Sequence, residues 1–328
     1  MEWCRRGSGR RAPIEWTVTE TRDLFAAIPR TEFDTPGKSH GLIDVVRWRY
    51  LLRLLVHTGV TTRYRNSVLG WVWSYVRPAA QFLVFWVVLG IFMNLDRVPN
   101  YAIYLFSGIV VINLFSEGYK NATGSIVGNA ALVRKVFLPR QLFAVSAVLV
   151  SFVHFLPQVG LLLVVCMLMG WLGHVTVLGI LGALAGMLIV MIFALGLGLL
   201  FGAVNVRFRD AENIVELMLL LATWASPVLY AWTMVYEAVV DKLGWPSWLV
   251  EVYMLNPITQ GVELFHYAFW RPTSQELVDV AGYAGDPLPP MPPDLAMNTL
   301  WTALIAVGTL LIGQLVFRRL EGKFAQDL

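Results

Sequence analysis

Few residues of this chain have the types and the spacing that nucleotide binding or metal binding requires. Gly37, Lys38 and Ser39 imitate the end of a phosphate-binding loop, but Glu32 stands where that loop needs a glycine, so we expect no nucleotide site. His154 stands alone in an apolar run without Cys, Asp or Glu at ligand spacing, which predicts no metal site. The chain is therefore expected to carry no cofactor of its own.

Charged residues are also rare inside the apolar runs. Glu117 and Lys120 are the main exception, and their spacing lets them pair on one helix face. Proton- or sodium-coupled transporters usually need buried acids that carry the ion. Their near absence predicts that energy comes from elsewhere, through a soluble partner that touches the cytoplasmic connections.

The elements that hold these residues are predicted to be membrane-spanning helices. The 328 residues are 57% hydrophobic and 14% charged, against about 25% charged in an ordinary soluble domain, and the mean hydropathy is +0.62. Apolar runs of about 20 residues recur, and each is long enough to cross a hydrocarbon core of about 30 Å. We therefore expect an all-α integral membrane protein. Its six predicted spans cover residues 71–93, 101–124, 143–169, 177–204, 214–235 and 299–317.

Three further segments flank or interrupt the spans. Residues 1–44 are predicted to form a cytoplasmic leader, residues 45–70 an amphipathic helix in the membrane interface, and residues 318–328 a cytoplasmic tail. A solvated helix on a soluble domain is the alternative for 45–70. The arginines of the interface helix are Arg47, Arg49, Arg53, Arg63 and Arg65.

The distribution of basic residues predicts the orientation. Lys and Arg gather in the leader, in the connections 125–142 and 205–213, and in the tail. By the positive-inside rule both termini are cytoplasmic, and an even number of spans requires the same.

The segment 236–298 is then external. Its first half is rich in aromatic residues but broken by Pro246 and Pro257, which favours two short helices that re-enter the outer leaflet; a cap that never enters lipid is the alternative. Its second half is proline-rich and is expected to be an extended loop. On the fourth span, small residues at four-residue spacing favour close helix packing within one protomer, with dimerisation as the alternative. These residues are Gly182, Gly186, Gly198 and Gly202.

Aromatic residues could line a path for a sugar polymer, since sugars stack on aromatic faces. Aromatic belts at the two membrane surfaces are the alternative for about half of them. The candidate path residues are Trp71, Trp73, Tyr75, Tyr101, Tyr104, Trp224 and Tyr230.

Four stretches resemble permeases of bacterial ABC exporters for polysaccharides, teichoic acids and O-antigens. They are RYRNSVLGWVWSYVRP at 63–78, LVRKVFLPRQL at 132–142, RFRDAENIVE at 207–216 followed by SPVLY at 226–230, and LNPITQGVELF at 255–265. They occur in the family's order, and the resemblance covers about residues 45–328. The long leader and the proline-rich insert near 287–293 depart from the common pattern.

The resemblance implies a type-2 ABC exporter fold in the bacterial cytoplasmic membrane. It implies a homodimer bound to two copies of a separate soluble ATPase, which holds ATP and magnesium, and no nucleic-acid partner. The implied cargo is a polysaccharide linked to a polyprenyl diphosphate lipid, and the chain looks most similar to actinobacterial galactan exporters. An ABC exporter permease for a drug or lipid is the alternative, and a membrane-embedded glycosyl or acyl transferase is a further one.

The resemblance also suggests roles for particular residues. Asn256 and Pro257 are candidates for an external gate. The candidates for contact with the ATPase are Arg134, Lys135, Pro139, Arg140, Arg207, Arg209 and Asp210.

Overall fold

The computed structural model describes residues 41–63, 70–92, 98–135, 138–275, 288 and 290–324, all within one compact unit, Ser39–Leu328. Within these residues the regular structure is helical throughout, without a β-strand, which confirms the all-α prediction. The predicted leader lies outside the described residues, apart from residues 41–44. Arg65, the side chain of Trp71 and the last four residues of the predicted tail also lie outside them.

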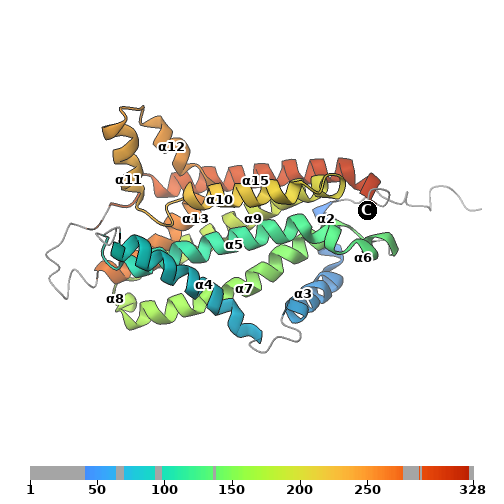
Figure 1. The fold of residues 1–328 in the computed structure, drawn as a ribbon, viewed down its shortest axis with the longest axis horizontal. Helices are drawn as coiled ribbons and strands as arrows, with labels where there is room; N and C mark the ends of the chain where they lie inside the picture. Colours follow the sequence, from blue (N-terminus) through green and yellow to red (C-terminus); the bar gives the residue numbers. More distant parts are fainter. Residues whose placement is uncertain are drawn as a thin grey trace, which may run out of the picture. The chain divides into compact units, whose positions relative to one another are not determined.

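Five helices are long and apolar enough to cross a membrane (Figure 1). They are α4 continued by η2 (Trp73–Phe92), α5 (Tyr101–Gly128), α7 (Gln141–Leu168), α9 (Val177–Arg207) and α15 (Leu295–Leu320). They correspond to the first, second, third, fourth and sixth predicted spans. The shorter helices before and between them are α2 (Leu42–Arg47), α3 (Arg49–Arg63), η1 (Gly70–Val72), α6 (Ala130–Lys135) and α8 (Trp171–His174).

The second half of the chain adds further short helices. These are α10 (Ala211–Trp224), α11 (Trp232–Tyr236), η3 (Glu237–Lys242), α12 (Trp248–Met254), α13 (Pro257–Phe265), η4 (His266–Trp270) and η5 (Glu321–Lys323).

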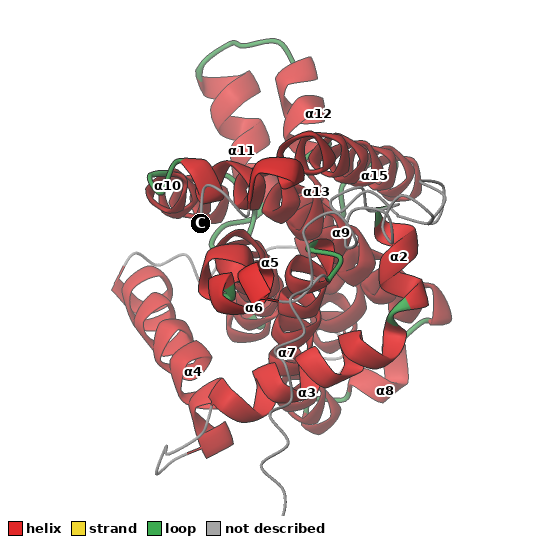
Figure 2. Ribbon diagram, turned by 90° about the vertical axis from the view of Figure 1, so that its right-hand side faces the viewer, coloured by secondary structure: helices red, strands yellow, loops and turns green. Residues whose placement is uncertain are grey.

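The central helix of the bundle is α5, which packs against α7 and α9, while α15 runs along α9 (Figures 1 and 2). Glycines allow these close approaches. A Cβ at Gly198 would lie 2.4 Å from the Cβ of Ala122 on α5, and a Cβ at Gly196 would lie 2.7 Å from the backbone nitrogen of Leu310 on α15. Gly186 faces the backbone of α13. The small residues of α9 therefore serve packing within one protomer, as the sequence favoured.

The predicted fifth span, 214–235, is not one helix. α10 ends at Trp224, and helical structure resumes only at Trp232. At 1.5 Å per residue α10 is about 21 Å long, which is too short to cross a hydrocarbon core of about 30 Å. Pro227 in the break cannot donate a backbone hydrogen bond, and hydroxyl groups of α5 take up carbonyls there: Tyr101 donates to Leu229 and Tyr104 to Pro227 and Tyr230.

The segment that the sequence predicts to be external contains short helices. α11, η3 and α12 project beside α15, whereas every residue of α13 is buried against α5, α9 and α15 (Figure 1). Trp171 and Trp270 donate hydrogen bonds to the carbonyls of Ala268 and Pro99, which fix η4 against the neighbouring turns. Whether these helices enter the outer leaflet stays a prediction.

Candidate functional site

The connection between α5 and α7 presents two basic side chains at one end of the bundle. Arg134 and Lys135 are exposed in the last turn of α6. Pro139 is buried instead, and Arg140 lies half-buried with its guanidinium 5.6 Å from the ring centre of Phe324. Burial lowers the pKa of Arg140, and the charge of Glu321 opposes that shift. Arg134 and Lys135 are thus available to a partner, whereas Pro139 and Arg140 hold the connection in place.

The connection between α9 and α10 is a sharp corner with three exposed charges. Arg207, Arg209 and Asp210 all reach the surface, and the guanidinium of Arg207 lies over the ring of Phe208 at 5.4 Å. Inside the corner, the Asn205 amide donates to Glu212 at 2.9 Å. The corner therefore combines one hydrogen bond in its interior with a charged outer face.

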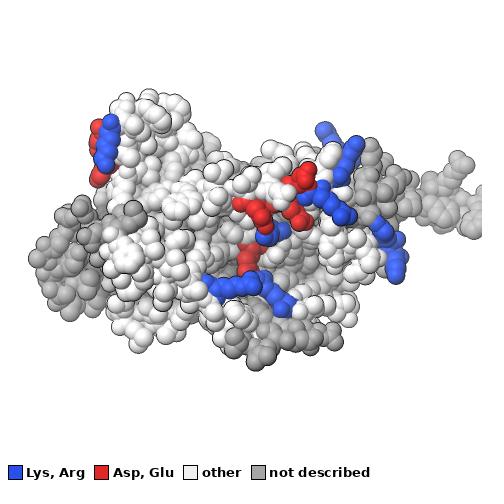
Figure 3. Space-filling view, in the orientation of Figure 1, with Lys and Arg blue, Asp and Glu red and all other residues white. Residues whose placement is uncertain are grey.

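Both connections rest on the same small apolar core. Val133 of α6 and Val206 of α9 belong to one buried cluster with Phe143, Phe317 and Phe324. On the face drawn in Figure 3, Lys and Arg gather toward the end with α2, α6 and the end of α15, and most of the opposite half is uncharged. A force applied to either connection would therefore reach α5, α7, α9 and α15 together.

The predicted interface helix is two helices, because the chain turns at Trp48 between α2 and α3. Arg47, Arg49 and Arg53 are exposed, and α3 packs against α7. No residue of α3 is buried, although Leu51 and Leu55 are half-buried. This fits a helix with one face on the bundle and the other toward lipid headgroups or water.

Glu117 and Lys120 do not pair with each other. Both oxygens of Glu117 accept hydrogen bonds from Arg63 at the end of α3, at 2.9 and 3.2 Å, and Lys120 contacts Glu216 of α10 at 2.6 Å. Spacing within one helix identified the charges but not their partners, which come from other helices. The two bridges tie α3 and α10 to the middle of α5.

The aromatic candidates for a polymer path fall into two groups. Trp73, Tyr75 and Trp224 expose 43%, 40% and 54% of their surfaces. Tyr101 and Tyr104 are buried, so, as a correction to the sequence-based set, neither ring faces an open surface. Tyr230 is half-buried, and its hydroxyl donates to the Trp224 carbonyl.

Tyr104 has a structural role at the end of the bundle that contains η4. Its ring stacks on His266 with 3.7 Å between ring centres, and the His266 ring contacts the Tyr104 carbonyl at 3.0 Å. The predicted gate residues also shape the fold. Asn256 accepts from the backbone N–H of Ile258 at 3.1 Å and caps α13, and Pro257 is its first residue.

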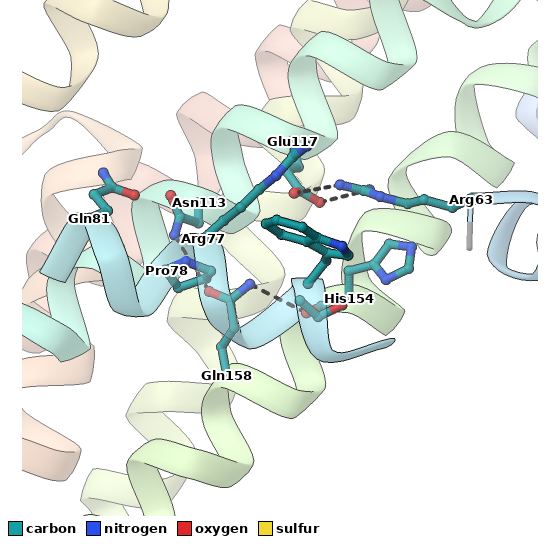
Figure 4. A pocket seen from close by; sticks show the side chains of 10 residues that line it. Arg63, Arg77, Pro78, Gln81, Asn113, Glu117, His154 and Gln158 are labelled. Atoms are coloured by element: carbon teal, nitrogen blue, oxygen red, sulfur yellow. Dashed lines mark hydrogen bonds and ion pairs between the residues drawn. The ribbon is translucent and has the colours of Figure 1, made fainter. Parts of the chain in front are cut away.

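A polar pocket of about 370 Å³ lies between α4, α5 and α7 (Figure 4). Its lining residues come from four helices that are distant in sequence, so spacing along the chain could not reveal it. They are Arg63, Trp73, Ser74, Arg77, Pro78, Gln81, Asn113, Glu117, His154 and Gln158. A larger groove of about 990 Å³ runs under α3, and Arg63 borders both spaces.

Chemically, this arrangement suits binding and movement better than bond making. Among the described residues there is no group of three or more His, Cys, Asp or Glu side chains that could hold a metal ion. The features that stand out are an exposed charged end, two interhelical salt bridges and a polar pocket.

Comparison with known proteins shows to which family the chain belongs. The sequence profile of the ABC-2 type transporter family matches residues 50–270. The chain belongs to the ABC-2 type transporter family. The match includes α4 to η4 together with most of α3, and therefore the pocket and both charged connections.

Several curated relatives of this ABC-2 type transporter are export permeases. The O-antigen export system permease protein RfbA of Klebsiella pneumoniae is 26% identical over 242 residues, covering 72% of this chain and 86% of the relative. RfbA of Myxococcus xanthus is 28% identical over 245 residues, covering 73% and 88%. The polysialic acid transport protein KpsM of Escherichia coli is 23% identical over 265 residues, covering 80% and 90%. These names describe transport subunits rather than enzymes. This chain is likewise a transport subunit.

Proposed function

We propose that this ABC-2 type transporter is the permease of an ATP-driven exporter that moves a polysaccharide linked to a polyprenyl diphosphate lipid across the cytoplasmic membrane. The observation that carries the proposal is the family match over residues 50–270, together with relatives named for O-antigen and polysialic acid export. Galactan is the cargo we propose, on the resemblance of the sequence to galactan exporters.

The proposed energy source is a separate ATPase that binds the charged end of the bundle. Arg134 and Lys135 on α6 and Arg207, Arg209 and Asp210 at the α9–α10 corner are exposed there. Opposite charges across an interface steer association and fix register. Because both connections share the core around Phe143 and Phe317, closure of the ATPase would move several helices as one body.

The proposed assembly has two copies of this chain and two of the ATPase, with the polymer path between the two copies. The exposed aromatic rings of α4 and α10 support this arrangement, since Trp73 and Trp224 are available to a sugar or to a second copy. The stretch 101–116 of α5 contains no charged residue, which suits the passage of a neutral sugar chain.

Depletion of the chain in the cells that make it tests the function. Surface polysaccharide should fall, and a lipid-linked saccharide should accumulate inside, released from its lipid by mild acid and analysed for galactose. Accumulation of a saccharide without galactose would reject galactan and keep polysaccharide export. Accumulation of a drug or an unglycosylated lipid instead would support the alternative exporter function.

Charge reversal tests the coupling. Arg207→Glu combined with Asp210→Lys should leave the chain folded and lower polymer export several-fold in the assembled complex. Unchanged export, with the ATPase still bound, would contradict a coupling role for this corner.

Cysteine labelling tests the orientation. In a chain without Cys4 and Cys166, a cysteine at the exposed Ser247 should react with an impermeant thiol reagent added to intact cells. A cysteine at the exposed Lys135 should react only after the cells are opened. The reverse pattern would invert the topology.

A further inference from the structure

The polar pocket has one wall on α4 that is unusual for a membrane helix. Ser74, Pro78 and Gln81 lie on one face of α4, and Ser74 and Pro78 are the only two buried residues of that helix. Helix faces that pack in membranes are rich in small residues, with a few polar side chains that bond across helices, and they usually leave little space. Here the inward face borders about 370 Å³ of space, within the range of roughly 300–1,000 Å³ that is typical of small-molecule sites.

The charges of the pocket favour an anion. Arg63 and Arg77 are opposed by Glu117 alone, so the pocket carries a net charge of +1 with His154 neutral. Glu117 already accepts both of its hydrogen bonds from Arg63. Figure 4 shows the Arg77 side chain reaching across the pocket toward Glu117. Arg77 makes no hydrogen bond or ion pair with any described residue.

The donors around Arg77 are suited to phosphate. A guanidinium group presents a planar set of N–H donors that matches phosphate oxygens in pairs. The amides of Gln81, Asn113 and Gln158 add further N–H donors. One N–H of Asn113 is given to the Gln158 side-chain oxygen at 3.5 Å and one N–H of Gln158 to the His154 carbonyl at 3.3 Å, which leaves the second N–H of each for a ligand. A neutral ligand would leave the excess positive charge of the pocket without a counter-charge.

The depth of the pocket identifies the source of the phosphate. From Glu117 to the outer end of α5, residues 101–116 are uncharged and rise about 24 Å at 1.5 Å per residue, which is most of a hydrocarbon core of about 30 Å. Residues 78–92, in α4 and η2, are likewise uncharged. The pocket therefore lies near the boundary of the inner leaflet, where lipid phosphates are found.

We propose that this pocket binds the diphosphate group of the lipid carrier, with Arg77 as its principal ligand and Arg63 as the second. This rests on the proposed function, because only a lipid-linked cargo brings a diphosphate to that depth. When the diphosphate binds, Arg63 is shared between the ligand and Glu117, so headgroup binding bears directly on the contact between α3 and α5.

Binding of farnesyl diphosphate, a short polyprenyl diphosphate, tests the site. The full chain in phosphatidylcholine nanodiscs should bind it, as measured by calorimetry. Arg77→Gln should weaken binding at least tenfold, and Arg77→Lys should weaken it less, since lysine keeps the charge and loses the paired geometry. Arg319→Gln, which removes an exposed charge at the end of α15 outside the pocket, should bind as the wild type does.

A second variant separates ligand binding from damage to the fold. Glu117→Gln removes the single acid of the pocket and keeps an acceptor for Arg63, so farnesyl diphosphate should bind several-fold more tightly. Weaker or unchanged binding by this variant would count against the proposal. Equal binding by Arg77→Gln and the wild type, or no binding by the wild type, would overturn it.

Competition identifies the source. Phosphatidylglycerol and inorganic diphosphate should each compete at least tenfold less well than farnesyl diphosphate, and equal competition by either would overturn the assignment to a lipid carrier. Unaltered binding in Arg77→Gln beside normal polysaccharide export would overturn the site and keep the proposed function. Loss of binding in that variant, in a chain that exports no polysaccharide, would overturn the function and keep a diphosphate site.

Discussion

α4 and α5 are both long apolar helices, yet they are used differently. In the apolar window of α5, 78% of the residues are buried inside the chain, against 17% for α4. α5 contacts α7, α9, α10 and α13, whereas α4 touches α5 and α7 mainly around the polar pocket. α5 is therefore the core helix of the bundle, and α4 leaves most of its surface outside it. Hydropathy alone does not distinguish these two roles.

Removal of a tyrosine ring from each helix should give the largest difference in the free energy of unfolding. Tyr104→Ala on α5 should lower the free energy of unfolding by about 3–5 kcal/mol, because the buried ring leaves a cavity and the carbonyls of Pro227 and Tyr230 lose their donor. Tyr75→Ala on α4, where the ring is exposed, should cost under about 1 kcal/mol. Thermal unfolding in detergent measures both, and equal losses would break the comparison.

Overpacking should have the next largest effect. A Cβ at Gly108 of α5 would lie 3.0 Å from the Cα of Val228, so Gly108→Leu should destabilise the chain by about 1–3 kcal/mol. Gly160→Leu on α7 is the matched control, since no atom lies within 4 Å of a Cβ there. If both substitutions melt at the wild-type temperature, the contact of α5 with the break after α10 is looser than described.

The salt bridge between Arg63 and Glu117 should have a smaller effect on stability. Both side chains are about one-third exposed, and such pairs contribute roughly 0.2–1 kcal/mol. A double-mutant cycle with Arg63→Ala and Glu117→Ala should give a coupling free energy in that range, reduced by added salt. A coupling of several kcal/mol would show instead that α3 is an integral part of the folded bundle.

The smallest stability effect is expected where export should respond most. Trp73→Ala together with Trp224→Ala should change the free energy of unfolding by under about 1 kcal/mol, since both rings are largely exposed. Polymer export should fall several-fold and lipid-linked polymer should accumulate, with ATPase activity largely kept. Normal export by the assembled variant would show that these residues belong to the aromatic belts at the membrane surfaces and not to the polymer path.

The sequence predicted the elements better than their partners. Five of the six predicted spans correspond to continuous helices because long uncharged runs are visible without knowledge of the fold. The fifth is interrupted near Ser226 and Pro227. Proline alone does not mark a helix break in this chain, since Pro78 and Pro157 lie inside helices that continue past them.

The polar pocket was beyond the reach of sequence reasoning for a different reason. Asn113, His154 and Gln158 are isolated polar residues on two helices, and each has an ordinary explanation when read alone. The packing of α5 against α7 brings them together, and α4 adds the remaining wall of the pocket. In the same way, Glu117 was matched with Lys120 because both lie on one helix, while Arg63 is its actual partner.

The interruption after α10 has a mechanical consequence. A break in a helix within a membrane leaves backbone carbonyl groups exposed. In the break after α10, two phenolic hydroxyls of α5 bind the carbonyls of Pro227, Leu229 and Tyr230. The interruption is thus held to α5, the most deeply buried of the five long helices, and it cannot move by itself without leaving those carbonyls unpaired in hydrocarbon. A displacement of α10 must therefore end at this break or turn α5 with it, so the break acts as a fixed pivot and not as a hinge.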